Sequence, residues 1–436
     1  MDFIYGEEET GAKMKRTIIT SVFTACIVLQ SAYSQLTVES CWKKAAQHYP
    51  LSAQLQLINN NGRLDNTNAN LRYLPQVSIS GKGTAQTEVM QLPVNIPGID
   101  EISKFQYSGV IEVNQIIWDG GATRSQKRIS AASSKVEKSK LVVDLYTLNE
   151  RINRLFFGIL LTEEQLKQNS IFQDELQTNY RRYLSLMQNG LASQSDLDLI
   201  KVEQLNADQQ RIELSSALHT YREILSEMIG EQLPGNVTLV KPDYNNFSTD
   251  DKSIQRPEIA LFDMQNDLLL SQKSALISGV RPKLSLFGQG LLGYPGINQF
   301  QNEYSDWLVA GVRLGWELGG FYSLRNNYAK IENNIGRLKK EKETFLFNTK
   351  LQVMQQKNEI DKYKELIKMD EEIIALRNDV KKASEARVEN GTISVTDLIK
   401  DINAVNLAIQ EKSLHEIQLL ISIYNLKNSI NNQGQL

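Results

Sequence analysis

The strongest constraint on the fold is that the chain repeats one plan twice, with corresponding landmarks about 200 residues apart. These landmarks keep their order and nearly their spacing: Pro50 with Pro257, Pro75 with Pro282, Gly120-Gly121 with Gly319-Gly320, and Asn189-Gly190 with Asn390-Gly391. Four landmarks that recur in order and at nearly constant spacing indicate an internal repeat of one structural plan. We therefore divide the chain, after its first 34 residues, into a first repeat (35–230), a connecting segment (231–256), a second repeat (257–430) and a C-terminal tail (431–436).

Each repeat contains two segments in which apolar and polar residues alternate, as they do in β-strands. In the first repeat these are 76–89 and 105–118, and in the second they begin at Lys283 and end near Trp316. Strands of roughly 10 to 13 residues cross a bilayer when tilted. A half-buried strand of a soluble sandwich alternates in the same way. Aromatic residues near the strand ends favour the membrane, because Trp and Tyr concentrate at its interfaces.

Long helices follow the strands. The segments 122–189 and 321–390 contain no proline, and each would be roughly 100 Å long as a helix. Apolar residues at alternating spacings of three and four predict coiled-coil packing. Both segments end at Asn-Gly, and return helices are expected from Ser193 to Ile229 and from Ser394 to Asn428. The segment 36–71 is also predicted to be helical, with a weak point at the asparagines 59–61.

Four strands per chain cannot close a barrel, and lipid does not tolerate an open sheet edge. Three copies would supply twelve strands and twelve helices. The fold class predicted is therefore an α+β membrane protein, in which a transmembrane β-barrel is continued by a long α-helical coiled-coil barrel. The polar face of the strands would line water, and the apolar face would contact lipid.

The N-terminal segment has the features of a secretory signal. A basic pair, an apolar stretch and small residues at the −3 and −1 positions occur in order: Lys15-Arg16, 17–29 and Ala32-Tyr33-Ser34. This pattern predicts a signal peptide over 1–34, cleaved before Gln35, with translation starting at Met14. Lipid attachment at Cys26 is an open alternative. Cys41 would then be the one cysteine of the mature chain, which excludes an intramolecular disulfide.

Composition excludes several classes of function. The formal net charge is −3, and no nucleic-acid-binding motif is present. The mean hydropathy of −0.35 and the absence of a long uncharged apolar run after residue 35 argue against spanning helices. The three histidines, His48, His219 and His415, are far apart in sequence, and no phosphate loop or nucleophile motif occurs. We expect no enzyme activity, no cofactor and no metal site.

The order of helix, β-hairpin, long helix, tip and return helix, present twice, resembles the TolC family of outer-membrane efflux proteins. The residues that carry the resemblance are Pro75, Pro282, the junction Trp118-Asp119-Gly120-Gly121 and the two Asn-Gly tips. It covers essentially the whole mature chain. It implies a homotrimer in outer-membrane lipid of a Gram-negative bacterium, extending into the periplasm. The tips would dock to a periplasmic adaptor and, through it, to an inner-membrane transporter.

Two rival classes are a periplasmic coiled-coil adaptor and a purely structural coiled coil. An adaptor of this kind has one helical hairpin, with β-domains formed by its flanking halves. A structural coiled coil would lack the four alternating strands. Neither class fits the repeated order of helices and β-hairpins as well as an export channel does.

The resemblance also implies functional residues at the tips. The residues expected to contact an adaptor are Asn189, Gly190, Leu191, Ala192 and Ser193 in the first repeat, and Asn390, Gly391, Thr392, Ile393 and Ser394 in the second. Acidic residues after the second tip form the periplasmic entrance in this family. Asp397 falls at the first such position, Lys400 occupies the second, and Asp401 lies beside it.

Two features of this entrance need separate mention. Ile393 replaces a basic residue that some members of the family carry at the tip. Asp397 has a second interpretation, because Ser394-Val395-Thr396-Asp397 has the spacing of a capping box, as does Ser193-Gln194-Ser195-Asp196. A capping aspartate can still face a pore, so the two roles are compatible.

Overall fold

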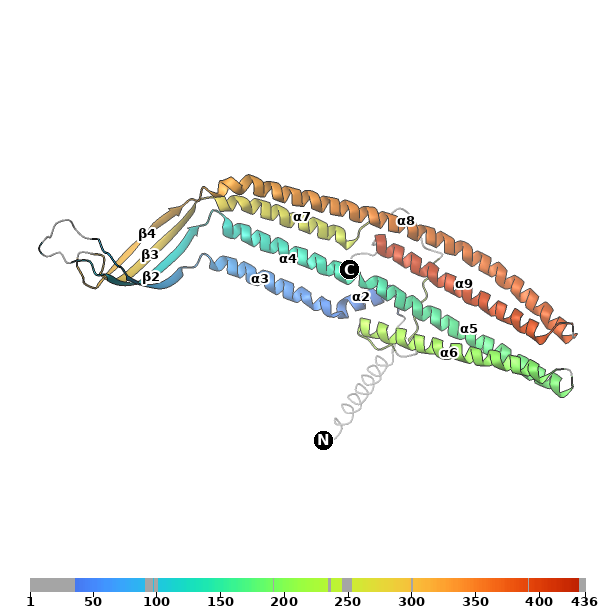
Figure 1. Ribbon diagram of the computed structural model, residues 1–436. Helices are drawn as coiled ribbons and strands as arrows, with labels where there is room; N and C mark the ends of the chain where they lie inside the picture. Colours follow the sequence, from blue (N-terminus) through green and yellow to red (C-terminus); the bar gives the residue numbers. More distant parts are fainter. Residues whose placement is uncertain are drawn as a thin grey trace, which may run out of the picture. The chain divides into compact units, whose positions relative to one another are not determined.

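The computed structural model describes residues 36–90, 97, 101–190, 192–233, 237–244, 253–298, 301–390 and 392–430 (Figure 1). The predicted signal peptide, with Cys26, and the tail 431–436 lie outside these residues. The chain forms two compact units. We call them the strand unit (Pro50–Tyr146 and Gln255–Lys350) and the hairpin unit (Met1–Tyr49, Thr147–Ile254 and Leu351–Leu436). Each unit contains segments of both repeats.

The strand unit contains one antiparallel sheet with strand order β1-β2-β3-β4. Its strands are β1 (Gln76–Ala85), β2 (Phe105–Trp118), β3 (Lys283–Tyr294) and β4 (Ser305–Gly315). The β2–β3 pairing joins the two repeats, and it places Glu112 opposite Gln289. The four strands predicted from alternation are confirmed. The first one ends at Ala85, however, so Val89 is not part of it.

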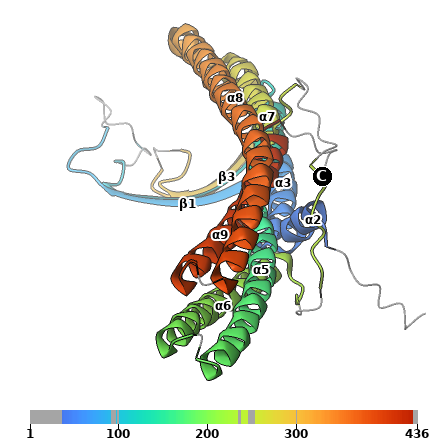
Figure 2. The same ribbon diagram turned by 90° about the vertical axis from the view of Figure 1, so that its right-hand side faces the viewer.

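One face of this sheet is apolar and exposed. Ile79 opposes Ile111 on it, and the exposed fractions of Ile79, Leu308 and Val312 are 78%, 87% and 64%. Figure 2 shows that the sheet is curved. Monomeric soluble proteins rarely expose a contiguous apolar face of this kind, so it marks a contact surface.

The helices of the strand unit are α3 (Gln54–Leu71), α4 (Ala122–Tyr146), α7 (Pro257–Ala275) and the part of α8 (Gly320–Glu389) before residue 351. Two short 3-10 segments, Pro50–Ala53 and Leu276–Val280, precede α3 and β3. Helix α4 packs against both α3 and α7. The long helix predicted over 321–390 is confirmed.

The weak point predicted at residues 59–61 is wrong, because α3 runs through these asparagines. The interruption lies instead at Tyr49, whose backbone is extended at φ −58° and ψ 131°. Pro50 explains it, since a proline disfavours helical backbone in the residue before it.

The hairpin unit contains α2 (Val38–His48), α5 (Leu148–Gln188), α6 (Gln194–Ile229), the later part of α8, and α9 (Val395–Ile430). The helix predicted over 122–189 is two helices, because α4 ends at Tyr146 and α5 begins at Leu148. Thr147 between them keeps right-handed backbone angles. No proline or glycine marks this break in the sequence.

Helix α2 is fixed in the hairpin unit by polar contacts, of which those of Trp42 are buried. The indole Nε1 of Trp42 donates to Asn153 Oδ1 at 2.9 Å and to the carbonyl of Asn149 at 3.3 Å. The hydroxyl of Tyr424 donates to Glu39 at 2.9 Å. These bonds tie α2 to both α5 and α9.

The connecting segment 231–256 also contacts the hairpin unit where it is described. Leu239 forms a parallel bridge with Leu36, and Lys241 Nζ lies 2.6 Å from Glu416 on α9. Residues 234–236 and 245–252 of this segment lie outside the described part.

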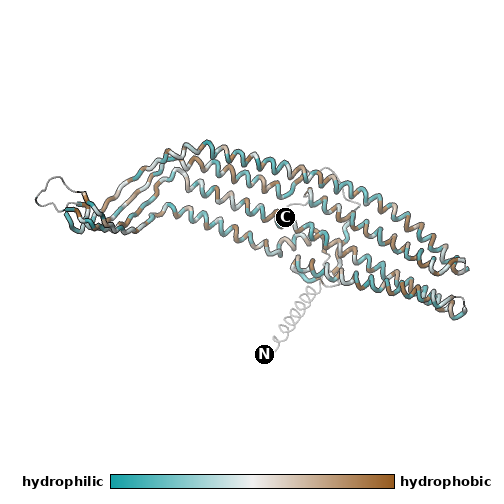
Figure 3. The backbone as a smooth tube through the Cα atoms, viewed as in Figure 1, coloured by the Kyte–Doolittle hydropathy of each residue, from teal (hydrophilic) through white to brown (hydrophobic). Residues whose placement is uncertain are grey.

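Within the described residues, no helix has both the length and the apolarity needed to cross a membrane. Figure 3 shows hydrophilic and hydrophobic residues interleaved along every long helix.

The junction between β2 and α4 is built around Asp119, which is 5% exposed. Its carboxylate accepts from the backbone nitrogens of Gly121 at 2.9 Å and Thr123 at 2.7 Å, and from the Tyr73 hydroxyl at 3.2 Å. Gly120 has φ +70°, and a Cβ there would lie 2.8 Å from the side chain of Arg281. The Asp119 side chain therefore caps the first turn of α4, and the glycines let the backbone turn around it.

Asp119→Ala is expected to lower the free energy of unfolding by about 1–2 kcal/mol at neutral pH, because a buried cap is lost. Burial alone would raise the pKa of Asp119, but hydrogen bonds from Thr123, Gly121 and Tyr73 outweigh it and lower the pKa. The stabilisation is then present above the unfolded pKa and is lost as the pH falls through the folded one. Urea unfolding followed by circular dichroism at pH 7 and pH 3 measures both effects.

The matched control is Asp267→Ala, which removes an exposed aspartate from α7 of the same unit. It should change stability by no more than about 0.5 kcal/mol. Equal losses in the two variants, or a loss in Asp119→Ala that does not shrink at pH 3, would contradict the capping role.

Candidate functional site: the hairpin ends

The ends of the two helical hairpins share a hydrophobic core. Side chains of α5, α6 and α9 form it in two adjacent clusters: Tyr183, Leu197, Ile200, Val395 and Ile399 in one, and Phe172, Leu176, Ala207, Leu398 and Ile402 in the other. Val388 of α8 packs against both clusters. Because the two repeats contribute to one core, their tips lie side by side within the hairpin unit.

The first tip follows the end of α5. Asn189 caps the helix, with its side-chain nitrogen donating to the carbonyl of Ser185 at 2.8 Å. Gly190 has φ +72°, a left-handed conformation that favours glycine. Among the described residues, no atom lies within 4 Å of a Cβ placed on Gly190. The backbone angle, not lack of space, therefore requires glycine here. Leu191 lies outside the described residues.

Helix α6 then begins with the predicted capping box. The backbone nitrogen of Asp196 donates to Ser193 Oγ at 3.2 Å, and that of Ser193 donates to Asp196 Oδ2 at 2.9 Å. Ala192 packs against the core of the hairpin ends. This cap fixes the direction in which the return helix leaves the tip.

The second tip has related but distinct contacts. Asn390 donates through its side chain to the carbonyl of Ala386 at 2.8 Å, and Thr392 donates to the carbonyl of Arg387 through its nitrogen at 2.9 Å and its hydroxyl at 2.8 Å. Gly391 lies outside the described residues. Ile393 is half-buried.

The predicted capping box after the second tip is also present. Asp397 N donates to Ser394 Oγ at 3.2 Å, and Ser394 Oγ donates to Asp397 Oδ2 at 2.7 Å. The bond from the Ser394 hydroxyl is the main reason that the pKa of Asp397 lies below its usual range. Asp397 is therefore a carboxylate at neutral pH, and its capping role is confirmed.

The three predicted entrance residues do not form one cluster. Lys400 Nζ lies 3.6 Å from Asp397 Oδ1, and the two side chains are 72% and 52% exposed. Asp401 instead accepts from the hydroxyl of Ser384 on α8 at 2.6 Å. The exposed surface after the second tip therefore carries one acid and one base close together, while Asp401 joins α9 to α8.

Two of the three histidines lie beside an acidic side chain. His415 Nδ1 lies 2.7 Å from Asp370 Oδ2, between α9 and α8, and His219 lies 3.2 Å from Glu223 on the same helix. Within the described residues, no group of three or more His, Cys, Asp or Glu side chains is placed to hold a metal ion. The His415–Asp370 pair is a helix-to-helix contact.

Further ion pairs join the helices of the hairpin unit. Lys381 of α8 lies 2.8 Å from Glu175 of α5, and Lys412 of α9 lies 2.9 Å from Glu371 of α8. The first pair connects the two hairpins to each other. No sequence pattern predicted these pairs, because their members are far apart along the chain.

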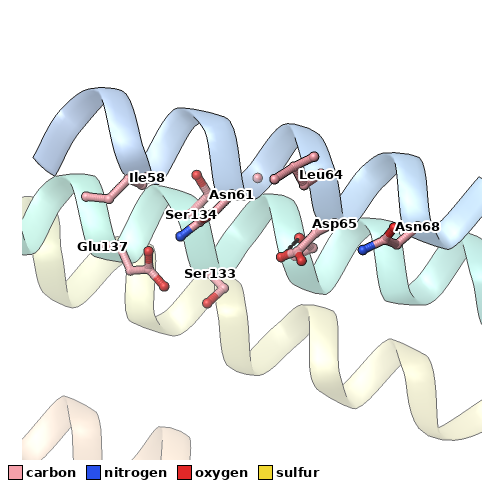
Figure 4. A pocket seen from close by; sticks show the side chains of 10 residues that line it. Ile58, Asn61, Leu64, Asp65, Asn68, Ser133, Ser134 and Glu137 are labelled. Atoms are coloured by element: carbon pink, nitrogen blue, oxygen red, sulfur yellow. Dashed lines mark hydrogen bonds between the residues drawn. The ribbon is translucent and has the colours of Figure 1, made fainter.

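A polar cavity of about 370 Å³ lies between α3 and α4 of the strand unit (Figure 4). Its lining includes Asn61, Asp65, Asn68 and Glu137, and Asp65 accepts from Ser130 at 2.9 Å. The other lining residues include Ser133 and Ser134 of α4 and the apolar side chains of Ile58 and Leu64 of α3. The cavity is a mainly polar gap between two helices.

No protein-family model and no curated protein sequence matches the chain. The arrangement of long helices and one small antiparallel sheet is nevertheless similar to that of solved outer-membrane channel structures, as expected from the resemblance to the TolC family. Solved structures do match it. The outer membrane protein VceC from Vibrio cholerae has a TM-score of 0.62 at 10% identity, over 90% of this chain and 94% of that one.

The Campylobacter jejuni outer membrane channel CmeC has a TM-score of 0.64 at 13% identity, over 90% of this chain and 85% of that one. The open state of the Neisseria gonorrhoeae outer membrane channel MtrE has a TM-score of 0.63 at 11% identity, covering 90% and 88%. The likeness therefore extends over nearly the full length of all these chains. At such low identity it defines the fold alone.

Proposed function

We propose that the chain is one subunit of a homotrimeric outer-membrane export channel, the outermost part of a tripartite efflux or secretion system. The observation that carries the proposal is the four-stranded sheet. Within the described residues, β1 and β4 each pair with one strand, so both edges of the sheet are open. Lipid does not tolerate such edges, and three copies joined edge to edge would close a twelve-stranded barrel.

The two faces of the sheet differ in polarity, which indicates which face points outward in this barrel. The exposed apolar face, with Ile79, Leu308 and Val312, faces lipid in the proposed assembly. Tyr107, Tyr294 and Tyr304 cluster at one end of the strands, with ring centroids 5.2 to 5.6 Å apart. Tyrosines at this level suit the interface between lipid and water. The polar face lines the pore.

The helices continue the pore into the periplasm, and the paired hairpin ends bind a periplasmic adaptor, which links the channel to an inner-membrane transporter. The shared core of the two tips supports this role, because it presents both tips as one surface. The alternative, a periplasmic adaptor or structural coiled coil, accounts for neither the sheet shared between repeats nor the likeness to channel structures. That likeness also favours a non-enzymatic role.

Leu308→Arg tests the proposal, because the two environments of its face predict opposite outcomes. In lipid an arginine near the bilayer midplane costs about 2–4 kcal/mol, so the variant should accumulate poorly as an outer-membrane trimer. In water, where Leu308 would be 87% exposed, the change would be harmless. Native mass spectrometry of detergent extracts from outer membranes measures the trimer.

The matched control is Gln289→Arg, which places the same side chain on the polar face, opposite Glu112. It should assemble like the wild type. Wild-type levels of trimer from Leu308→Arg, or a wild-type protein that is monomeric in mild detergent, would contradict the proposal.

A further inference from the structure

The charged residues of the strands are sorted between the two faces of the sheet. The strands contain five of them: Lys82, Glu112, Lys283, Asp306 and Arg313. Asp306 pairs in register with Leu292 and so lies on the apolar face, at the end of β4. The other four lie on the polar face. That face therefore carries three positive charges and one negative charge in each chain.

Arg313 is the centre of this positive face. Its guanidinium carbon lies 4.8 Å from the ring centroid of Phe287 on the neighbouring strand. The Phe287 ring lies against Gly311, where an added Cβ would be 3.0 Å from the ring. The missing side chain at Gly311 thus makes room for the ring, and the ring in turn supports the guanidinium by a cation–π contact.

Glu112 neutralises Arg313 only in part. The closest oxygen of Glu112 is 3.7 Å from Arg313 Nη1, too long for a hydrogen bond, and the side chains are 35% and 53% exposed. Exposed pairs of this kind are weak. The half-exposed guanidinium therefore retains N–H donors that Glu112 does not satisfy, and Lys82 and Lys283 add positive charge to the same face.

We propose that this face forms a region of the outer pore that attracts anions. Arg313 is the residue of this region that binds solutes carrying a carboxylate. The inference rests on the proposed function, which turns the face into the wall of a lumen. Three-fold repetition would then place six excess positive charges around one channel, where low-dielectric walls concentrate the field. The planar fork of arginine matches a carboxylate with two hydrogen bonds.

The test measures the local potential by thiol chemistry in isolated outer membranes. Ser285 lies directly opposite Arg313 in the β3–β4 register, so Ser285→Cys places a thiol beside the guanidinium. Its reaction rates are measured with an anionic sulfonatoethyl and a cationic trimethylammonioethyl methanethiosulfonate. Arg313→Gln is expected to lower the anionic-to-cationic rate ratio by at least about threefold, because one charge per chain is lost nearby. Arg313→Lys should preserve the ratio.

Binding is tested in the same preparation. Sodium succinate, a dicarboxylate probe, should slow the anionic reagent at Ser285→Cys, and this protection should disappear in Arg313→Gln. Choline chloride at equal ionic strength is the salt control. The unmodified chain supplies the background, in which Cys41 is 0% exposed. Leu286→Cys, the next residue on the opposite face, should react far more slowly with both reagents.

The outcomes separate the two proposals. A thiol at position 285 that reacts with neither reagent means that the polar face is not aqueous, which overturns the channel and this inference together. A reactive thiol whose rate ratio is the same with and without Arg313, or that succinate does not protect, overturns the inference alone and leaves the channel intact.

Discussion

Gly190→Val is expected to abolish export while the trimer still assembles in the outer membrane. Gly190 has φ +72°, and a β-branched side chain is strongly disfavoured at such an angle. Because the space around a Cβ there is open among the described residues, the strain of roughly 1–3 kcal/mol arises in the backbone and distorts the tip itself. Export of a pump substrate from cells and native mass spectrometry of the extracted protein measure the two effects.

Gly190→Asn is the matched control, since asparagine tolerates left-handed backbone far better than valine does. It should retain most of the export activity. The same change at the second tip, Gly391→Val, is expected to act in the same way, as the repeat implies. Full export from a chain that carries both valines would refute the assignment of the tips as the adaptor-binding surface.

Most of the fold could be predicted because it depends on local sequence patterns. Strict alternation of apolar and polar residues over several positions predicts a strand, and an Asn-Gly pair predicts the end of a helix. The internal repeat then predicted the second half from the first. The break at Thr147 could not be predicted, since neither proline nor glycine marks it. The break before α3 was missed although Pro50 signals it.

In the candidate site, too, contacts between residues close in sequence could be predicted, and contacts between distant residues could not. The capping boxes of Ser193 and Ser394 involve residues three apart, and the sequence predicted both. The partners of Asp401 and His415 lie on another helix, 17 and 45 residues away. Such pairs depend on how α8 and α9 pack together, which no single-sequence pattern specifies. The contact of Asp401 with Ser384 therefore could not be predicted, whereas its place near the entrance stays a prediction from the family resemblance.

Lys400→Asp is expected to make the channel markedly more cation-selective. In the wild type, Lys400 lies 3.6 Å from Asp397, one turn away on the same exposed face of α9. In the proposed trimer three such pairs would surround the axis, and each lysine would largely cancel the field of its aspartate. The substitution replaces three positive charges with three negative ones, so cations should concentrate at the entrance. Stronger block by divalent cations should accompany the change.

The measurement is the reversal potential of single channels in a planar bilayer under a potassium chloride gradient. Lys201→Asp is the matched control, because it makes the same charge change on α6 of the first hairpin, where Lys201 is also exposed. It should leave the reversal potential unchanged. If Lys400→Asp also leaves it unchanged, Asp397 and Lys400 do not face the pore, and the hydrogen bonds of Asp397 to Ser394 serve only to cap α9.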